Sequence, residues 1–331
     1  MTIRINRDVP AQIGHKWTGE REREWMARRR DKWLTRDTQI FAIGSCFAVN
    51  FTRWLVQQGL PLAVPPWGMH YNPATILNEL KSASGRRSKQ LVWTVTDQFG
   101  KTKYIDAMRH TILSDNKDDF DKQQIEIERI SKEMYRKADA FVITLGLSEI
   151  WESSLERSDL VINRSPYVAG DHTKNYRNRF LSVDEVVQYI QQIVEIIRID
   201  KGDSTPIVFS ISPVPLKMTN SGYDPQIANI RSKAILIAAI HSFIDEDTAK
   251  RPASYFPAYE IFLGAPRFEK LWQADLRHPT AEAIDYVCRR FIENYRYGEF
   301  SLDSIVKFTV PEVACLPNSE SQSSTGPLLL S

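Results

Sequence analysis

Two side chains that can act as nucleophiles lie next to each other near the start of the chain. Ser45 and Cys46 follow the apolar run 40–43 and a glycine, and both residue types can form acyl-enzyme intermediates. Apolar residues then recur at helical spacing up to Gly59, where a helix would stop. The segment predicts a strand, a tight turn and a helix whose first turn carries Cys46.

The start of a helix favours negative charge at Cys46. Unpaired backbone N–H groups and the positive end of the helix dipole lower the pKa of a thiol there. The same N–H groups can bind the oxyanion of a tetrahedral intermediate. Ser45 stands at the N-cap position, where its hydroxyl would accept a hydrogen bond from the helix. In the alternative interpretation Ser45 only caps and Cys46 only packs, and these residues alone leave both open.

A base and a carboxylate that can orient it occur together in "DLRHP". Asp275 and His278 are three residues apart, just before a helical pattern that has Pro279 near its first turn. A carboxylate at this spacing can hold the imidazole in one tautomer and stabilise the imidazolium. Alone, this spacing is weak evidence for a catalytic pair, since an Asp and a His in an exposed turn without function would look identical in sequence. Together with the nucleophile it supplies nucleophile, base and orienting group.

Strands that alternate with long helices are expected to position these groups. Such an order is typical of α/β proteins with a parallel sheet covered on both faces, where functional groups collect at the carboxyl ends of the strands. We expect buried strands within 40–43, 139–146, 206–216 and 253–262, and helices from about Pro73 and within 118–138, 183–199, 225–245 and 278–298. Two short strands around Gly100 read as an insertion, and 157–180 as a long surface loop.

Composition narrows the functional class. The 331 residues include 43 Lys and Arg against 41 Asp and Glu, so that bulk charge does not favour nucleic-acid binding. Three scattered cysteines predict free thiols in a reducing compartment. The N-terminus lacks the apolar core of a signal peptide, and the run 234–240 is too short for a membrane span. We therefore expect a cytoplasmic protein without a membrane span.

Three regions follow from the same reading of the chain. Residues 1–37 form a charged extension, 38–312 form the α/β domain, and 313–331 form a tail of disordered composition. Within the extension, 20–33 predicts a surface helix that docks through its aromatic residues, one of which is Trp33. A nucleic-acid-binding arm at 27–32 is the weaker alternative, and no nucleic-acid partner is expected.

The chain resembles the GSCFA family. The segment "GSCFA" is the motif after which that family is named, and further similar segments follow in order between about 38 and 290. They are "GMHYNPATI" from Gly68, "TLGLSEIW" from Thr144, "SPVPLKMT" from Ser212, "SKAIL" from Ser232, "YFPAYEI" from Tyr255 and "DLRHPT" from Asp275. The resemblance thus covers most of the chain.

The resemblance implies a place among the SGNH (GDSL-like) hydrolases and acyltransferases, which have a flavodoxin-like, three-layer α/β/α sandwich with a mainly parallel sheet. It implies Cys46 as the nucleophile, with Ser45 as the alternative, His278 as the base and Asp275 as the orienting residue. The oxyanion-binding and substrate-binding positions that it implies are Gly68, Gly146 and Ser148, together with Ser45 beside the nucleophile. Serine at 148, where that superfamily has asparagine, is a shorter donor. Asn72 is a further donor, with an Asx turn before Pro73 as the alternative.

The activity that these residues imply is acyl transfer through a thioester on Cys46. The protein would be an esterase or an O-acyltransferase, with water or a saccharide hydroxyl as acceptor, and the link to saccharides comes from the superfamily alone. No cofactor is expected; an acyl donor such as acetyl-CoA would be a substrate. Nothing in the sequence demands a metal or indicates an oligomeric state. The alternative is a catalytically retired protein that binds a glycan or an acyl ligand.

Several other residues near these motifs allow two interpretations. His70 is expected to be a surface histidine rather than a substrate contact. Lys233 is either an exposed lysine on a helix face or a contact for an anionic substrate group. Trp67, Trp93 and Trp151 flank the loops of the expected site and favour packing over stacking on sugar rings.

Overall fold

Four parallel strands form the main sheet of the protein. The computed structural model describes residues 31–60, 64–96, 99–155, 160–264 and 271–298. The sheet consists of β1 (Ile40–Gly44), β5 (Ala140–Leu145), β9 (Ile207–Ile211) and β10 (Ser254–Phe256), in the order β1-β5-β9-β10. Nearly all their side chains are apolar and buried, as expected for parallel strands that are covered on both faces.

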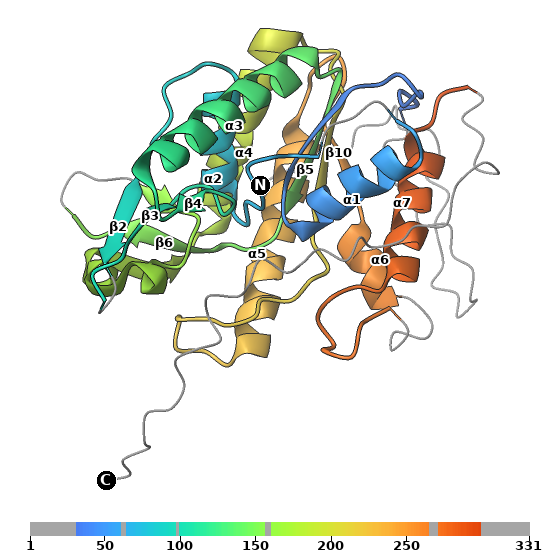
Figure 1. Cartoon of the computed structure of the whole chain (residues 1–331). Helices are drawn as coiled ribbons and strands as arrows, with labels where there is room; N and C mark the ends of the chain where they lie inside the picture. Colours follow the sequence, from blue (N-terminus) through green and yellow to red (C-terminus); the bar gives the residue numbers. More distant parts are fainter. Residues whose placement is uncertain (1–30, 61–63, 97–98, 156–159, 265–270, 299–331) are drawn as a thin grey trace.

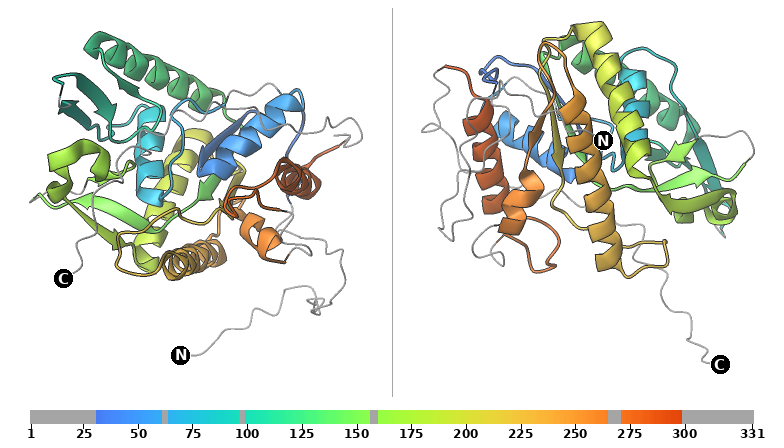
Figure 2. Two further views of the ribbon diagram at one scale, coloured as in Figure 1. Left: turned by 60° about the horizontal axis from the view of Figure 1, so that its bottom comes forward. Right: turned by 180° about the vertical axis from the view of Figure 1, so that it is seen from behind.

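Helices cover both faces of this sheet and give three layers (Figure 1). One face packs against α2 (Pro73–Ala83), α3 (Lys117–Lys137), α4 (Val183–Lys201) and α5 (Pro225–Glu246). The other packs against α1 (Cys46–Gln57), α6 (Ala258–Gly264) and α7 (Ala281–Tyr295). Figure 2 shows the two groups of helices on opposite sides. The predicted α/β class with a mainly parallel sheet is confirmed. In the described residues no strand pairs with the outer edge of β1.

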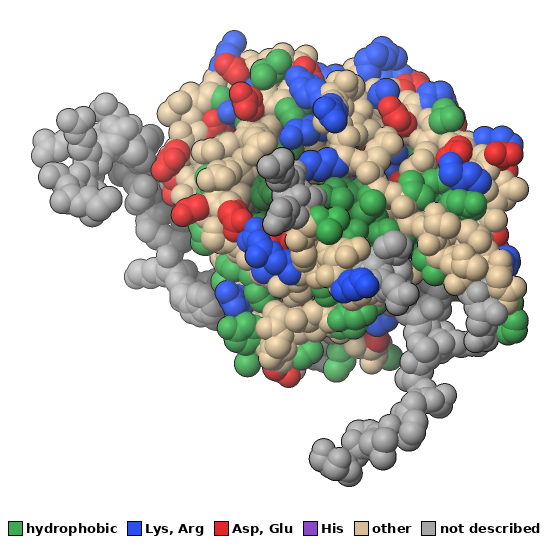
Figure 3. Space-filling view, turned by 90° about the vertical axis from the view of Figure 1, so that its left-hand side faces the viewer, with side chains coloured by type: hydrophobic (Ala, Val, Ile, Leu, Met, Phe, Trp, Pro, Cys, Tyr) green, Lys and Arg blue, Asp and Glu red, His purple; other side chains and the backbone are tan. Residues whose placement is uncertain are grey.

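Two small antiparallel sheets extend from one side of the main sheet. The first contains β2 (Val92–Thr96), β3 (Thr102–Asp106) and β4 (Leu113–Ser114); the second contains β7 (Val161–Ile162), β6 (Glu149–Ser153) and β8 (Tyr176–Phe180). Trp93, Ile105, Met108 and Ile162 form a shared apolar cluster between them. On this side of the molecule hydrophobic side chains gather near the centre, with Lys and Arg around them (Figure 3).

Two sequence-based expectations about local structure need correction. The segment 157–180 is not a surface loop, since within its described part it forms β7, a 3₁₀ segment (Pro166–Asn175) and β8. The apolar run 253–262 is only briefly a strand and continues as α6. The insertion around Gly100 is confirmed as β2 and β3, which pair antiparallel.

The charged extension is described only from residue 31 onward, so most of its expected helix, and the tail 313–331, lie outside the described residues. Trp33 packs against Phe291 and Tyr295 of α7, with ring centroids 6.3 and 5.6 Å away. This aromatic residue docks on the domain as expected.

One described helix, α5, is long and apolar enough to cross a membrane by length and composition alone. Several of its side chains, among them Leu236, Ala239 and Ile240, are buried in the core beside the main sheet. A core helix of this kind passes the same test, so α5 gives only weak support for a membrane span.

Gly44 joins the first strand to the first helix under a tight steric constraint. It pairs with Thr144 across the sheet and has a φ of +135°. A Cβ atom built on it would lie 2.0 Å from the carbonyl oxygen of Thr144, far inside contact distance. Only glycine fits this position, because both the backbone conformation and the space exclude a side chain.

We expect Gly44→Ala to lower the free energy of unfolding by about 3 kcal/mol or more, since it adds backbone strain to a direct clash. Gly59→Ala is the matched control: Gly59 also has a positive φ, +80°, but nothing lies within 4 Å of its Cβ position. The control should lose about 1–2 kcal/mol. Denaturant unfolding measures both, and equal losses would contradict the role given to the Thr144 contact.

Candidate active site

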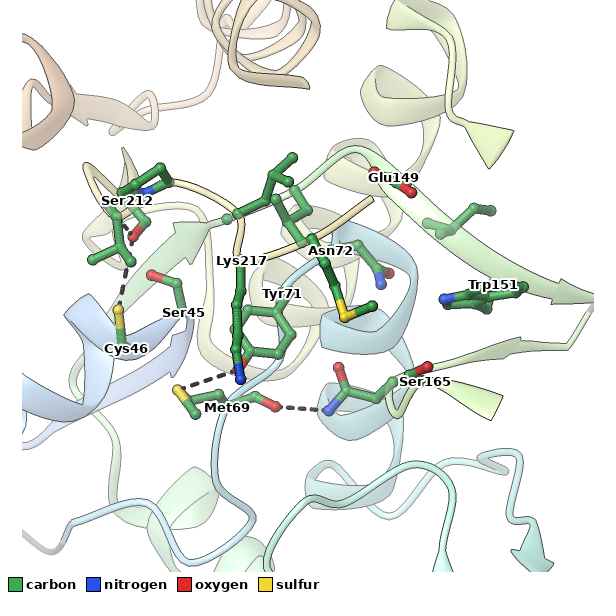
Figure 4. A pocket seen from close by; sticks show the side chains of 18 of the residues that line it. Ser45, Cys46, Met69, Tyr71, Asn72, Glu149, Trp151, Ser165, Ser212 and Lys217 are labelled. Carbon is green, nitrogen blue, oxygen red and sulfur yellow. Dashed lines mark hydrogen bonds between the residues drawn. The ribbon is translucent and has the colours of Figure 1, made fainter. Parts of the chain in front are cut away.

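A cavity of about 330 Å³ opens at the carboxyl edge of the main sheet. Its wall brings together segments that follow β1, β5 and β9, together with the turn before α7, as expected for this type of sheet. The residues of the sequence motifs that line this cavity include Ser45, Cys46, Gly146, Ser212, Arg277 and His278. Figure 4 shows Cys46 beside Ser212, with Trp151 across the pocket.

Ser45 is the N-cap of α1. Its backbone is extended, and its Oγ accepts a hydrogen bond from the N–H of Phe47 at 3.3 Å. The same hydroxyl lies 3.0 Å from Oγ1 of Thr144, and the residue is almost completely buried. These contacts favour the capping role of Ser45 over that of a nucleophile.

Cys46 is the first residue of α1 and is half-buried in the pocket wall. Its Sγ lies 4.0 Å from the hydroxyl of Ser212. Since Ser212 Oγ accepts the N–H of Val214 at 3.3 Å, its own hydrogen is free to point at the sulfur. Ser212 thus belongs to the site; the sequence motif "SPVPLKMT" contained it, but its role was not assigned.

The pKa of the Cys46 thiol differs from the sequence-based expectation. Burial raises it above the ordinary value of 9.0, and this outweighs the Ser212 hydrogen bond, the positive charges of Lys233 and Arg277, and the residue's own backbone N–H, all of which lower it. The expected net lowering at the helix N-terminus is therefore wrong. A thiol in this state needs a base before it can attack.

Asp275 and His278 form the expected pair within one turn. Asp275 Oδ2 lies 2.5 Å from Nδ1 of His278, while its Oδ1 accepts the backbone N–H groups of Arg277 and His278, each at 3.0 Å. These three hydrogen bonds lower the pKa of Asp275, the backbone ones first. Leu276 adopts a left-handed φ of +54°, which closes the turn.

The other ring nitrogen of His278 faces a cation. Arg277 Nη1 lies 3.1 Å from Nε2 of His278, and Arg277 Nε donates to the carbonyl of Pro215 at 3.1 Å. An arginine can only donate, so Nε2 must carry a lone pair and Nδ1 the hydrogen that Asp275 accepts. This is the tautomer of a general base. Cys46 and His278 line the same pocket, but in this arrangement the sulfur contacts Ser212 and the imidazole contacts Arg277.

The loop before α2 crosses the carboxyl edge of the main sheet and is held there by backbone hydrogen bonds. His70 N–H donates to the carbonyl of Gly44 at 2.7 Å, and the carbonyl of Tyr71 accepts the N–H groups of Gly146 and Leu147. The N–H of Gly146 is therefore occupied, although the residue lines the pocket. Gly68 has a positive φ and packs next to His110 and Thr111, but it does not itself line the pocket.

Asn72 is both a helix cap and a pocket residue. Its Oδ1 accepts the N–H of Thr75 at 3.0 Å and caps α2, which starts with Pro73. Because the accepting atom must be the oxygen, this bond fixes the orientation of the amide. Nδ2 has no hydrogen-bond partner among the described residues. The two sequence-based interpretations of Asn72, local cap and pocket donor, are thus compatible.

Ser148 has a different environment from that implied by the resemblance. It is completely buried, its N–H donates to Ser232 Oγ at 2.7 Å, and its hydroxyl lies 3.3 Å from the same atom. Its neighbours Leu147 and Glu149 line the pocket, but Ser148 does not. The geometry therefore gives Ser148 a role in joining β5 to α5.

Lys233 is buried beneath the pocket rather than exposed on a helix face. Its side chain is 1% exposed, and Nζ donates to the carbonyls of Gly146 at 2.7 Å and Val214 at 3.2 Å. Burial lowers its pKa to about 7, which the charge of Cys46 partly opposes. Lys233 thus ties the ends of β5 and β9 together under the thiol, a role that the sequence did not predict.

Two histidines near the site are buried. His70, expected at the surface, is 1% exposed, and neither ring nitrogen has a hydrogen-bond partner; Nε2 lies 3.7 Å from Glu79 Oε2. His110 lines the pocket and faces the carbonyl of Asn163 at 3.2 Å. Burial lowers the pKa of both to about 3, helped by the charges of Arg109 at His70 and Arg164 at His110. Both rings are neutral at pH 7.

The tryptophans near the site divide into two groups. Trp67 and Trp93 are buried, and Trp67 stacks on Phe41, so both pack as expected. Trp151 is half-buried and lines the pocket. Among the described residues no group of three or more His, Cys, Asp or Glu side chains is placed to hold a metal ion.

Comparison with protein families identifies the class of protein. A profile of the GSCFA family matches residues 39–291, which span every described element from β1 to α7 except the last residues of α7. The chain belongs to the GSCFA family. No curated protein and no solved structure matches it.

Lys233 should make stability depend on pH. It loses its proton near pH 7 in the folded protein and near pH 10.5 in the unfolded chain, so that the unfolded chain binds more protons between these values. The free energy of unfolding of the wild type, relative to Lys233→Met, should therefore rise from pH 7 to pH 10, by up to about 4 kcal/mol. Denaturant unfolding across this range measures the difference.

Lys132→Met supplies the control for this measurement, because Lys132 is exposed on α3 and pairs with Glu128. Its difference from the wild type should stay constant between pH 7 and pH 10. If the difference in free energy of unfolding between the wild type and Lys233→Met also stays constant over this range, Lys233 does not lose its proton near pH 7 in the folded protein.

Proposed function

We propose that this protein is an acyl-transfer enzyme, an esterase or O-acyltransferase of the SGNH-like kind, with Cys46 as its nucleophile. The observation that carries the proposal is the shared pocket: Cys46 at the start of α1 and His278 in the tautomer of a base line the same cavity. Asp275 holds that tautomer. The three-layer arrangement with its parallel sheet supports the SGNH-like placement.

Acylation begins with proton transfer. Nε2 of His278, once released from Arg277, takes the proton of the Cys46 thiol, and Sγ forms a bond to the carbonyl carbon of the donor. The tetrahedral intermediate collapses by breaking the bond to the leaving group, which receives the proton from His278. Asp275 stabilises the imidazolium in between. Ser212 donates to the sulfur while it is negatively charged.

The second half-reaction regenerates the thiol. His278 removes a proton from water or from a hydroxyl of the acceptor, whose oxygen attacks the thioester carbon. The carbon–sulfur bond breaks, and the thiolate takes the proton back from His278. A saccharide hydroxyl remains the proposed acceptor on family grounds, and Trp151 and Tyr71 in the pocket wall offer it flat apolar surfaces.

The oxyanion is expected to bind at Asn72. Of the donors considered from the sequence, Gly146 gives its N–H to Tyr71, Ser148 is bonded to Ser232, and Gly68 is outside the pocket wall. Nδ2 of Asn72 remains, on a side chain that its cap holds in place. The backbone N–H of Cys46, at the start of α1, is the second donor.

An activated acyl ester should form a covalent adduct that intact-mass spectrometry detects. The wild type and Ser45→Ala should be labelled, because Ser45 only caps α1; Cys46→Ala should not. His278→Ala should be labelled at least about 100-fold more slowly, since the thiol then lacks its base. Cys288, which is completely buried, should stay unmodified.

Each of the other results has a clear meaning. Loss of labelling only in Ser45→Ala would move the nucleophile to Ser45 and overturn the thiol mechanism. Absence of both labelling and turnover with every donor would favour the retired, ligand-binding alternative. One feature of the structure favours this alternative: Nε2 of His278 contacts Arg277 rather than Cys46.

The role of Asn72 can be separated from its cap. Asn72→Ser keeps an N-cap oxygen of similar strength but removes the amide donor, so stability should change by less than about 1 kcal/mol. The acylation rate should fall by about 100-fold, as for the loss of one oxyanion donor. Stopped-flow acylation and denaturant unfolding test this together. If the acylation rate falls only as far as the loss of folded protein explains, Asn72 acts as a helix cap and not as an oxyanion donor.

A further inference from the structure

Arg277 is a cation in the pocket wall whose side chain has no carboxylate partner among the described residues. It is half-buried, and its two side-chain contacts are a carbonyl oxygen, that of Pro215, and the neutral Nε2 of His278. A guanidinium cannot lose its proton in a protein, so the charge persists at every pH of interest. A partly desolvated cation without a counter-ion attracts an anion into the pocket.

The rest of the wall adds to this positive charge. Lys217 also lines the pocket, and its side chain projects among the lining residues in Figure 4. Lys233 lies beneath, on the carbonyls of Gly146 and Val214. Glu149 is the one carboxylate in the wall of described residues, and its oxygens accept from Thr219 and Asn220. Cations thus outnumber carboxylates at the pocket.

Arg277 also blocks the base. Its Nη1 occupies the lone pair of His278 Nε2, which is the atom that must take the proton of Cys46. Any ligand that pulls the guanidinium toward itself therefore frees the base at the same time.

We infer that the pocket takes a substrate that carries a carboxylate or phosphate group, and that this group pairs with Arg277 and draws it away from His278. Guanidinium forms two parallel hydrogen bonds to such anions, which a carbonyl and an imidazole nitrogen cannot match. The base then becomes available only when a charged substrate is present, and a neutral ester meets an occupied His278. This inference rests on the proposed acyl-transfer function.

Alkylation of Cys46 tests the anion site without any turnover. Iodoacetate and iodoacetamide are similar in size and differ in charge, so the ratio of their rates at Cys46 reports attraction of an anion. Arg277→Gln should lower this ratio about tenfold or more relative to the wild type, and Lys132→Gln should not change it. Inorganic phosphate or acetate should slow iodoacetate in the wild type only. An unchanged ratio in Arg277→Gln would overturn the anion site.

Turnover tests the release of the base. The acetyl thioesters of mercaptoacetate and of mercaptoacetamide form a matched pair of charged and neutral donors, and that of 2-mercaptoethyl phosphate adds the phosphate arm. The measured quantity is the ratio of kcat/KM for the charged donor to kcat/KM for the neutral donor. This ratio should be about tenfold or more higher in the wild type than in Arg277→Gln. The larger Arg277-dependent gain decides between carboxylate and phosphate.

The neutral donor separates a positioning role from simple binding. Because Arg277→Gln removes the guanidinium that occupies Nε2 of His278, kcat for the neutral donor should rise in this variant, whereas the loss of an anion site alone would leave it unchanged. An unchanged kcat for the neutral donor together with equal donor ratios would overturn the release of His278. Failure of all donors to acylate Cys46 in the wild type would instead refute the proposed function, while the alkylation ratio would still decide the anion site.

Discussion

The close contact between Gly44 and Thr144 sets the geometry on which the rest of the pocket depends. Where β1 ends, the N–H of Ser45 donates to both the carbonyl and the hydroxyl oxygen of Thr144, each at 2.9 Å. The chain then enters α1 with no further linker, so that Cys46 must be the first helical residue. The carbonyl of Gly44 in turn accepts the N–H of His70 and anchors the loop that carries Asn72. The end of β1 thus places both the proposed nucleophile and a proposed oxyanion donor.

Two opposing effects act on the thiol at this position. Helix N–H groups and nearby cations favour the thiolate, as the sequence suggested, but burial disfavours it more strongly. Sequence patterns report the first effect, because it depends on the residue's place in a helix. They do not report the second, because burial depends on segments far away in the chain, such as those that carry Ser212 and Lys233. A buried thiol stays protonated and unreactive until a base reaches it.

The same distinction explains which parts of the structure the sequence predicted. The helices other than α6 and the buried strands followed from apolar periodicity and from local signals such as Pro73 and Gly59, which act over a few residues. The strand β8 was missed, because its apolar and polar residues do not alternate in the sequence and it is extended through its pairing with β6. Motif spacing placed Ser148 after β5 but could not tell that Ser232, on α5, binds it. The pairing of Asp275 with His278 was predictable because both lie within one turn.

The pocket has two walls with separate origins in the fold. The edge of the main sheet supplies Cys46, Asn72 and the turn of His278, whereas Trp151 and Ile162 come from the small sheet of β6, β7 and β8. The small sheet shares an apolar cluster with β2 and β3, but its residues Ile150 and Val161 also belong to the core of the main sheet. A substitution at Trp151 would therefore change the space open to a ligand, whereas a substitution at Ile150 or Val161 would also disturb the packing of the main core.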